Sequence, residues 1–212
     1  MSGFGRDKSV DDPGFRGIIP DNTIVPVLII EGDGKLLMMK TGKNSGKTAR
    51  IYKPVCHVVG GKYRGARIFS DIWCNVEPDP AGGEPKVFGS HMVFCDLCDA
   101  TDVKDEDGDY PVAATEQDVK DICNRFVGHV VLMTVGIRTY KKKNGEDGSV
   151  NTTKSITIAT DNVKEHVAEE VVTVKKRVAE WQAKKAAEEG ATGFEDTGGN
   201  IPDDDDDDDL PF

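Results

Sequence analysis

Seven consecutive aspartates near the end of the chain, Asp203 to Asp209, limit how much of it can fold. A run of like charges repels itself and stays solvated, so it cannot enter a packed core. Residues 190–212 carry nine of the 38 acidic residues and no lysine or arginine, which leaves 29 acids against 27 bases in residues 1–189. The net charge of −11 therefore comes mainly from the tail, and the part that can fold is nearly neutral.

The 212 residues are enough for one domain with tails. Gly, Asp and Pro in the first 22 residues predict a flexible arm, and Gly, Thr and Asn after Gly190 predict a flexible linker. The N-terminus lacks the apolar segment of a signal peptide, and the longest apolar runs fall far short of the ~20 residues of a membrane span. Five cysteines, an odd number, do not suggest a secreted disulfide framework. We therefore expect a soluble protein of the cytoplasm.

Apolar stretches bounded by turn residues predict seven strands, at 24–30, 35–40, 50–59, 66–76, 86–97, 129–140 and 152–160. A Gly-Asp-Gly turn at Gly32–Gly34 is expected to join the first two as a hairpin. Thr115 to Val127 predicts a helix, because Thr115 and Asp118 form a capping-box pattern ahead of apolar residues at helical spacing. A second helix is expected from Asp161 to Glu189, along a valine stripe that ends at Trp181.

Several strands, one helix and then two strands is the element order of the OB-fold, a small barrel, although other α+β domains share it. We expect a mainly β (α+β) fold: an OB-fold-like barrel with one inserted helix, a C-terminal amphipathic helix and a disordered acidic tail. The corresponding segments are the arm 1–22, the barrel domain 23–160, the C-terminal helix 161–189, and the linker with its acidic tip 190–212.

Basic and aromatic residues gather in the middle of the chain. No acidic residue lies between Asp33 and Asp71, and the 36 positions from Lys35 to Ser70 hold nine lysines and arginines. In the strand 66–76, side chains alternate between two faces, and the rings of Phe69 and Trp73 fall on the polar face. Exposed rings leave apolar surface in contact with water unless nucleic-acid bases, the C-terminal helix or a second subunit covers them.

This composition suits single-stranded nucleic acid, because cations follow phosphates while flat rings stack on unpaired bases at about 1–3 kcal/mol per base. A basic solvated surface without a ligand is the simpler alternative. The loop at Lys141–Ser149 would flank the binding cleft of an OB-fold. The candidate DNA-binding residues are Lys40, Lys43, Lys47, Arg50, Tyr52, Lys53, Lys62, Tyr63, Arg64, Arg67, Phe69, Trp73, Arg138, Tyr140, Lys141 and Lys142.

The last ten residues read DDDDDDDLPF, an acidic arm with an apolar tip and a free carboxylate. A partner protein could hold such a tip with an apolar pocket and a basic residue. The tip resembles the C-terminal interaction peptide of bacterial and bacteriophage single-stranded DNA-binding proteins, in which an Asp run closes with Ile/Leu-Pro-Phe. The match covers about ten residues, and the rest of the chain suggests a divergent, phage-encoded member that would act in the cytoplasm of the host cell.

The resemblance implies a non-catalytic protein of DNA replication, recombination and repair that protects single strands and recruits enzymes through its tip. The partner-binding residues would be Asp207, Asp208, Asp209, Leu210, Pro211 and Phe212. Seven carboxylates tethered near a basic cleft should also compete with DNA for it. A homo-oligomer is compatible with this scheme.

Two further patterns resemble ligand-binding motifs but lack part of what those motifs require. Gly42 to Thr48 has three residues between its glycines where a phosphate-binding loop needs four, and a strand rather than a helix should follow. His91, Cys95 and Cys98 have metal-like spacing, but a structural zinc usually uses two close pairs of ligands. We therefore expect no metal or cofactor. A zinc-dependent nucleic-acid module, and an adaptor whose body does not bind DNA, remain the alternatives.

Overall fold

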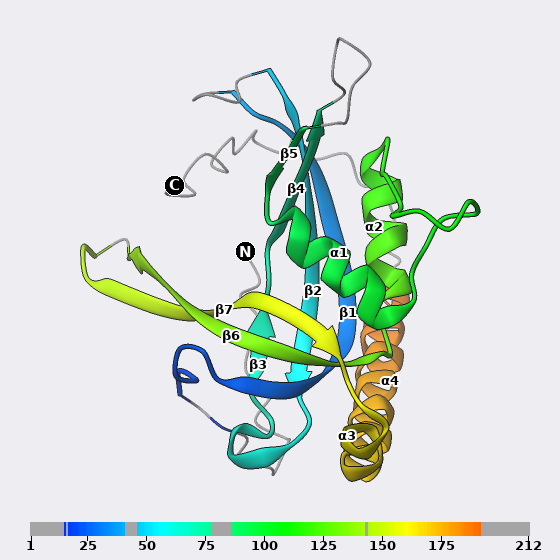
Figure 1. The fold of residues 1–212 in the computed structure, drawn as a ribbon. Helices are drawn as coiled ribbons and strands as arrows, with labels where there is room; N and C mark the ends of the chain where they lie inside the picture. The colour runs from blue at the N-terminus through cyan, green and yellow to red at the C-terminus, as the bar shows by residue number, and fades with distance from the viewer. Residues whose placement is uncertain (1–14, 16, 41–45, 78–85, 143, 192–212) are drawn as a thin grey trace.

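The computed structural model describes residues 15, 17–40, 46–77, 86–142 and 144–191. Antiparallel strands and helices make up this part of the chain, so the mixed α+β class is confirmed (Figure 1). The strands are β1 (Ile24–Met38), β2 (Thr48–Val58), β3 (Arg67–Phe69), β4 (Ile72–Glu77), β5 (Lys86–Gly89), β6 (Val130–Lys141) and β7 (Asp147–Ile158). The helices are α1 (His91–Thr101), α2 (Glu116–Arg125), α3 (Asp161–His166) and α4 (Ala168–Ala191), with a 3-10 turn at Gly61–Tyr63.

The seven strands form one curled sheet in the order β5-β4-β2-β1-β6-β7, and β3 also pairs with β2. The hairpin of β6 and β7 crosses in front of β2 and β3 in Figure 1, and β7 lies near β3. A hydrogen bond between the hydroxyl groups of Ser70 and Thr153 joins the β3–β4 connection to β7. The backbone pairing among the described strands nevertheless stays open between β3 and β7.

The Gly-Asp-Gly segment is not the turn that the sequence predicts. Strand β1 continues through it to Met38 with a register shift between Ile29 and Glu31, and the turn to β2 comes later. A Cβ atom at Gly32 would lie 2.5 Å from the carbonyl oxygen of Cys123, and one at Gly34 would collide with Val119. These glycines therefore allow helix α2 to lie directly on the strand.

The capping box that predicts α2 is confirmed. The hydroxyl of Thr115 accepts a hydrogen bond from the backbone N–H of Asp118 at 3.2 Å, and the Asp118 carboxylate accepts one from the Thr115 N–H at 2.8 Å. The strand predicted at 86–97 is wrong beyond Gly89, since α1 begins at His91. Phe94, Leu97 and Cys98 are buried at the spacing of one helix face, which a short apolar run does not distinguish from a strand.

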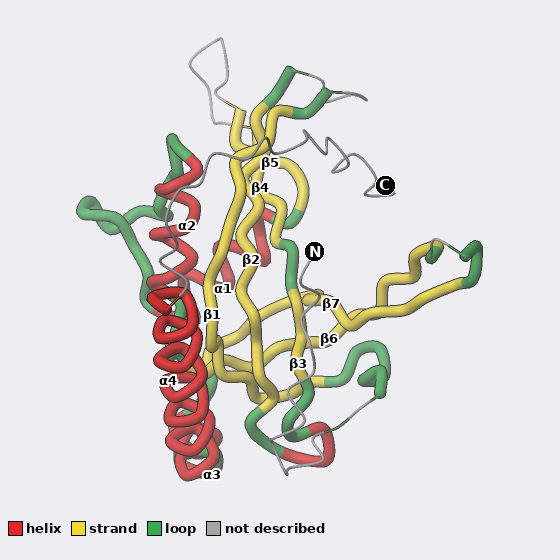
Figure 2. Tube along the Cα trace, turned by 180° about the vertical axis from the view of Figure 1, so that it is seen from behind, coloured by secondary structure: helices red, strands yellow, loops and turns green. Residues whose placement is uncertain are grey.

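The helix predicted from Asp161 to Glu189 is divided at Val167 into α3 and α4. The side chains of Val167 and Val174 on this segment are buried against Leu28, Ile30 and Val59 of the sheet. Figure 2 shows that α4 runs along one side of the sheet, over β1, while β2, β3 and β4 continue beside it. The valine stripe therefore packs against the body, as expected for an amphipathic helix.

The main core lies on the other face of the sheet, under α1 and α2. The rings of Tyr52 and Phe94 stack there with centroids 4.3 Å apart and planes 22° apart, and Phe126 meets Phe94 edge-on at 6.2 Å. Burial of this kind contributes about 25 cal/mol for each Å² of apolar surface removed from water. Among the described helices, none combines the length and apolarity that a membrane span requires.

Candidate nucleic-acid interface

The strand alternation predicted for residues 66–76 is confirmed over 66–74, where side-chain burial is described. Ala66, Ile68, Ser70, Ile72 and Cys74 are all buried, whereas Arg67, Phe69 and Asp71 are exposed and Trp73 is half-buried. The even-numbered residues of this segment therefore belong to the core, and the odd-numbered residues form an outer surface. We call this surface, together with the outward residues Lys53 and Val55 of β2, the outer face.

Phe69 is the prominent aromatic residue of the outer face, because 66% of it is exposed. Its cross-strand partner is Val55 of β2, and the described part of the chain leaves most of the residue uncovered. Trp73 is the cross-strand partner of Ile51 and keeps part of its indole at the same surface. These two rings and the exposed cation of Arg67 therefore share one surface.

Two of the aromatic residues predicted to contact DNA are buried. Tyr52 is fully buried in the stack with Phe94, and Tyr63 is buried with its ring edge-on to Phe15, the centroids 5.0 Å apart. Neither ring offers a face to a base in this structure. Their positions follow from the register of β2 and from the 3-10 turn after it, which the sequence pattern did not reveal.

Several predicted cations already have structural partners. Arg50 donates from Nε to the carbonyl oxygen of Ala113 at 2.5 Å, which ties β2 to the segment before α2. Arg64 pairs with Glu170 of α4 at 3.3 Å, and Lys62 lies 4.8 Å above the Tyr63 ring. Arg50 is therefore better explained as a structural residue, whereas Arg64 and Lys62 lie at the end of the outer face near α4.

The β6–β7 hairpin carries the last group of predicted residues. Arg138, Tyr140, Lys141 and Lys142 are all exposed. Lys141 pairs with Asp147 at 2.7 Å and Lys142 with Glu146 at 3.5 Å, both within the hairpin. The Tyr140 ring packs over Gly148, where a Cβ atom would lie 2.6 Å from Cζ. The hairpin projects from the body in both views (Figures 1 and 2).

The predicted residues thus fall into separate groups and not one patch. Lys53, Arg67, Phe69 and Trp73 share the outer face, and Lys40 and Lys47 lie at the β1–β2 connection beyond one end of it. The hairpin residues lie on a projecting arm joined to the β3–β4 connection through Thr153 and Ser70. Lys43 and the tip residues Asp207 to Phe212 lie outside the described residues.

The valine stripe predicted for the C-terminal helix ends at Trp181. The structure leaves 43% of this residue exposed, with the Lys185 ammonium 5.6 Å from the ring centroid. Its position one step beyond Val178 in the stripe gave no signal of this exposure.

The cysteine and histidine residues do not converge on one point. Cys74 Sγ lies 3.0 Å from Nδ1 of His91, and Cys95 Sγ lies 3.3 Å from Nε2 on the other side of the same ring. Burial lowers the pKa of His91 and raises the pKa of Cys74 to about 12, so a neutral imidazole meets protonated thiols. Within the described residues no group of three or more His, Cys, Asp or Glu side chains could hold a metal ion. The arrangement is that of hydrogen-bonded core residues.

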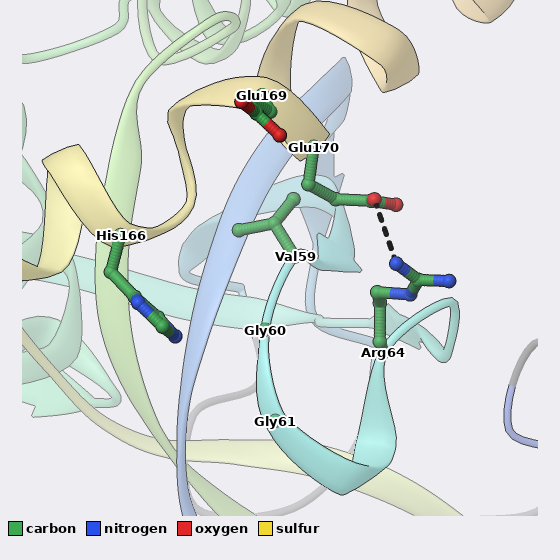
Figure 3. A pocket seen from close by; sticks show the side chains of 7 residues that line it. All are labelled: Val59, Gly60, Gly61, Arg64, His166, Glu169 and Glu170. Atoms are coloured by element: carbon green, nitrogen blue, oxygen red, sulfur yellow. Dashed lines mark hydrogen bonds and ion pairs between the residues drawn. The ribbon is translucent and has the colours of Figure 1, made fainter.

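A pocket of about 410 Å³ lies where α4 begins, beside the turn between β2 and β3 (Figure 3). His166 stands on one side of the Gly60–Gly61 segment and Arg64 on the other, where it pairs with Glu170. This ion pair links α4 to the turn between β2 and β3, so it stabilises the position of the helix. A neighbouring recess of about 400 Å³ shares Gly60, Gly61 and His166 and is lined largely by apolar side chains.

Comparison with known proteins gives no relative for this arrangement: no family model, curated protein or solved structure matches the chain. The outer face must therefore be interpreted from its own chemistry.

Proposed function

We propose that this chain is a non-catalytic protein that binds single-stranded DNA with little sequence preference on the outer face of β2, β3 and β4. The exposed ring of Phe69 beside the Arg67 guanidinium carries this proposal. A large apolar ring held on the solvent side of a strand gains little from folding, whereas an unpaired base can cover it.

The topology supports an OB-like interpretation of the domain. Along the sequence, helices α1 and α2 come after strands β3–β5 and before the β6–β7 hairpin. Strand β1 pairs with both β2 and β6, and β7 lies beside the β3–β4 connection. OB-folds bind oligonucleotides on the equivalent strand face and on the two flanking loops. In this chain the flanking loops would be the β1–β2 connection with Lys40 and Lys47, and the β6–β7 turn with Lys141 and Lys142.

The acidic tip Asp203 to Phe212 would serve a different purpose on the same protein. Its acidic run and apolar Leu-Pro-Phe residues suit capture by replication, recombination and repair enzymes, as the resemblance to single-stranded DNA-binding proteins implies. Such a protein would protect unpaired strands while bringing enzymes to them.

The test is a comparison of single- and double-stranded oligonucleotides of equal length by fluorescence anisotropy, using full-length protein and protein that lacks residues 203–212. We expect both forms to bind the thymidine homopolymer and to prefer it to duplex. The affinity should fall as salt rises, with a log–log slope of about −0.7 for each phosphate neutralised.

Failure of both forms to bind even at low salt would refute the proposal and favour the adaptor, whose tail alone engages partners. Equal affinity for a uridine homopolymer would extend the ligand to RNA, because stacking surfaces do not distinguish the sugars well.

A further inference from the structure

Three contacts fix how α4 is rotated about its own axis. Val174 is buried and Val171 and Val178 are partly buried against the sheet, so they mark the packed side. Glu170 reaches Arg64 in the turn that leads into β3. Lys175 lies on the other flank, where its Nζ would be 3.7 Å from a Cβ atom at Gly128, just before β6. One flank of α4 therefore faces β3 and the other faces β6.

The flank that faces β3 continues along the helix. Each residue of an α-helix turns by about 100° and rises by about 1.5 Å. Arg177 and Trp181, seven and eleven residues after Glu170, therefore lie within about 20° of its direction. They stand roughly 10 and 16 Å further along the axis. The Arg177 side chain and the Trp181 ring are both exposed, Trp181 by 43%.

This flank borders the outer face. Val55 packs against the cluster that α4 covers, and Val55 is the direct cross-strand partner of Phe69. Cross-strand partners have Cβ atoms about 5 Å apart, so the exposed Phe69 ring lies one strand width from Val55, at the edge of this cluster. Figure 2 shows the same order, with α4 along one side of β1 and β2 and with β3 beyond them.

We infer that this flank of α4 is a second wall of the single-strand site, in which Trp181 stacks on a base and Arg177 contacts the phosphate backbone. The inference rests on the proposed function, because it assumes that DNA lies on the outer face. It adds a helix that the sequence assigned to packing alone.

The chemistry of the two walls is complementary to a single strand. The Phe69 side supplies a ring and the Arg67 cation, while the α4 side supplies the Trp181 ring with the Arg177 and Lys185 cations. Rings on two sides of a strand can stack on separate bases, and arginine suits phosphate because its guanidinium forms paired hydrogen bonds. At its N-terminal end the Arg64–Glu170 pair holds the wall in place.

The chain has two tryptophans, Trp73 and Trp181, so each can be made the only one. In full-length protein with Trp73→Phe, we expect the thymidine homopolymer to quench Trp181 emission in step with an anisotropy change measured on a labelled oligonucleotide. Inorganic polyphosphate, which has the charges but no bases, should leave the emission unchanged. Trp181→Ala should weaken binding by about fivefold or more, the lower limit for losing one stacked base.

A matched pair of charge reversals tests the direction of the wall. Arg177→Glu and Lys175→Glu make the same change two residues apart on opposite flanks of α4. We expect Arg177→Glu to weaken binding and to reduce the salt slope by about 0.7, the value for one phosphate contact, whereas Lys175→Glu should act far less. Thermal unfolding of both variants checks that the helix stays docked.

The outcomes separate the two proposals. If the labelled oligonucleotide binds while Trp181 emission stays constant, or if the two charge reversals weaken binding equally, the wall is refuted and DNA binding elsewhere on the outer face stands. If the oligonucleotide binds neither the Trp73→Phe variant nor the unaltered protein, the proposed function is itself refuted.

Discussion

Replacement of Phe69 by alanine should separate DNA affinity from stability. The ring is 66% exposed, so its removal takes away only about a third of the burial that a core phenylalanine would lose. A core Phe→Ala substitution typically costs 3–5 kcal/mol, and we therefore expect about 1 kcal/mol or slightly more at this site. The domain should remain folded at room temperature, since typical stabilities are 5–15 kcal/mol.

The substitution should remove a larger fraction of the binding free energy for DNA than of the unfolding free energy. Loss of one base stacked on an aromatic ring costs about 1–3 kcal/mol, which corresponds to a dissociation constant roughly 5- to 150-fold higher. The slope of affinity against salt should not change, because the substitution removes no charge. Phe69→Leu should recover the stability but little of the affinity, since it restores apolar area without a flat ring.

Anisotropy of a labelled thymidine homopolymer at several salt concentrations measures both quantities. Met92→Ala is the matched control: Met92 is 71% exposed on α1, which covers the opposite face of the sheet. It should leave the affinity unchanged. If Phe69→Ala binds as tightly as the unaltered protein, the ring does not stack on a base and the outer face is not the site.

Four further predictions concern the cap, the core and the tail. Thr115→Ala should cost about 1 kcal/mol in chemical unfolding, whereas Thr160→Ala should cost little, because Thr160 makes no side-chain cap hydrogen bond within the described chain. The backbone N–H groups of Thr115 and Ala114 hold the pKa of Asp118 below its ordinary value of 3.8. The stability that the ionised carboxylate adds is complete above pH 3.8 and should disappear as the pH falls through the lowered pKa. The unfolding free energy of Asp118→Asn should therefore differ from that of the unaltered protein at neutral pH and converge with it in acid. Tyr52→Phe should leave DNA affinity unchanged and leave the unfolding free energy equal or up to about 1 kcal/mol higher, because the buried hydroxyl finds no partner among the described residues. Deletion of residues 203–212 should tighten DNA binding at low salt and have less effect at high salt, where screening weakens the tail's competition; equal affinity at every salt concentration would exclude that competition.

Local patterns with a strict spacing could be predicted from the sequence. The period of two in residues 66–74 places Ile68 and Phe69 on opposite faces, and the structure buries the first completely and exposes the second. The capping box at Thr115 marks the start of α2 because its two hydrogen bonds involve residues only three apart. Such features depend on neighbours in sequence and need no knowledge of the rest of the fold.

Features set by tertiary packing could not be predicted in this way. Gly32 and Gly34 have the composition of a turn, but they remain in β1. Helix α2 packs closely against the strand at these two positions, where any side chain would collide with it. Residues 91–98 form a helix because Phe94 and Leu97 reach the core from one face, although the same run suits a strand. In each case a partner distant in sequence decides the local structure.

The placement of α4 decides which side chains of the outer surface can bind a ligand. Leu28 and Ile30 of β1 and Val59 just after β2 are buried in one cluster with Val167 and Val174 of the C-terminal helical segment. One strand further, next to the partly buried Val55, Phe69 is exposed. If α4 lay one strand over, it would cover Phe69 and the outer face would lose its most exposed ring. The Arg64–Glu170 pair and the packed valines therefore maintain the site as well as the stability, since they hold the helix on one side of Phe69.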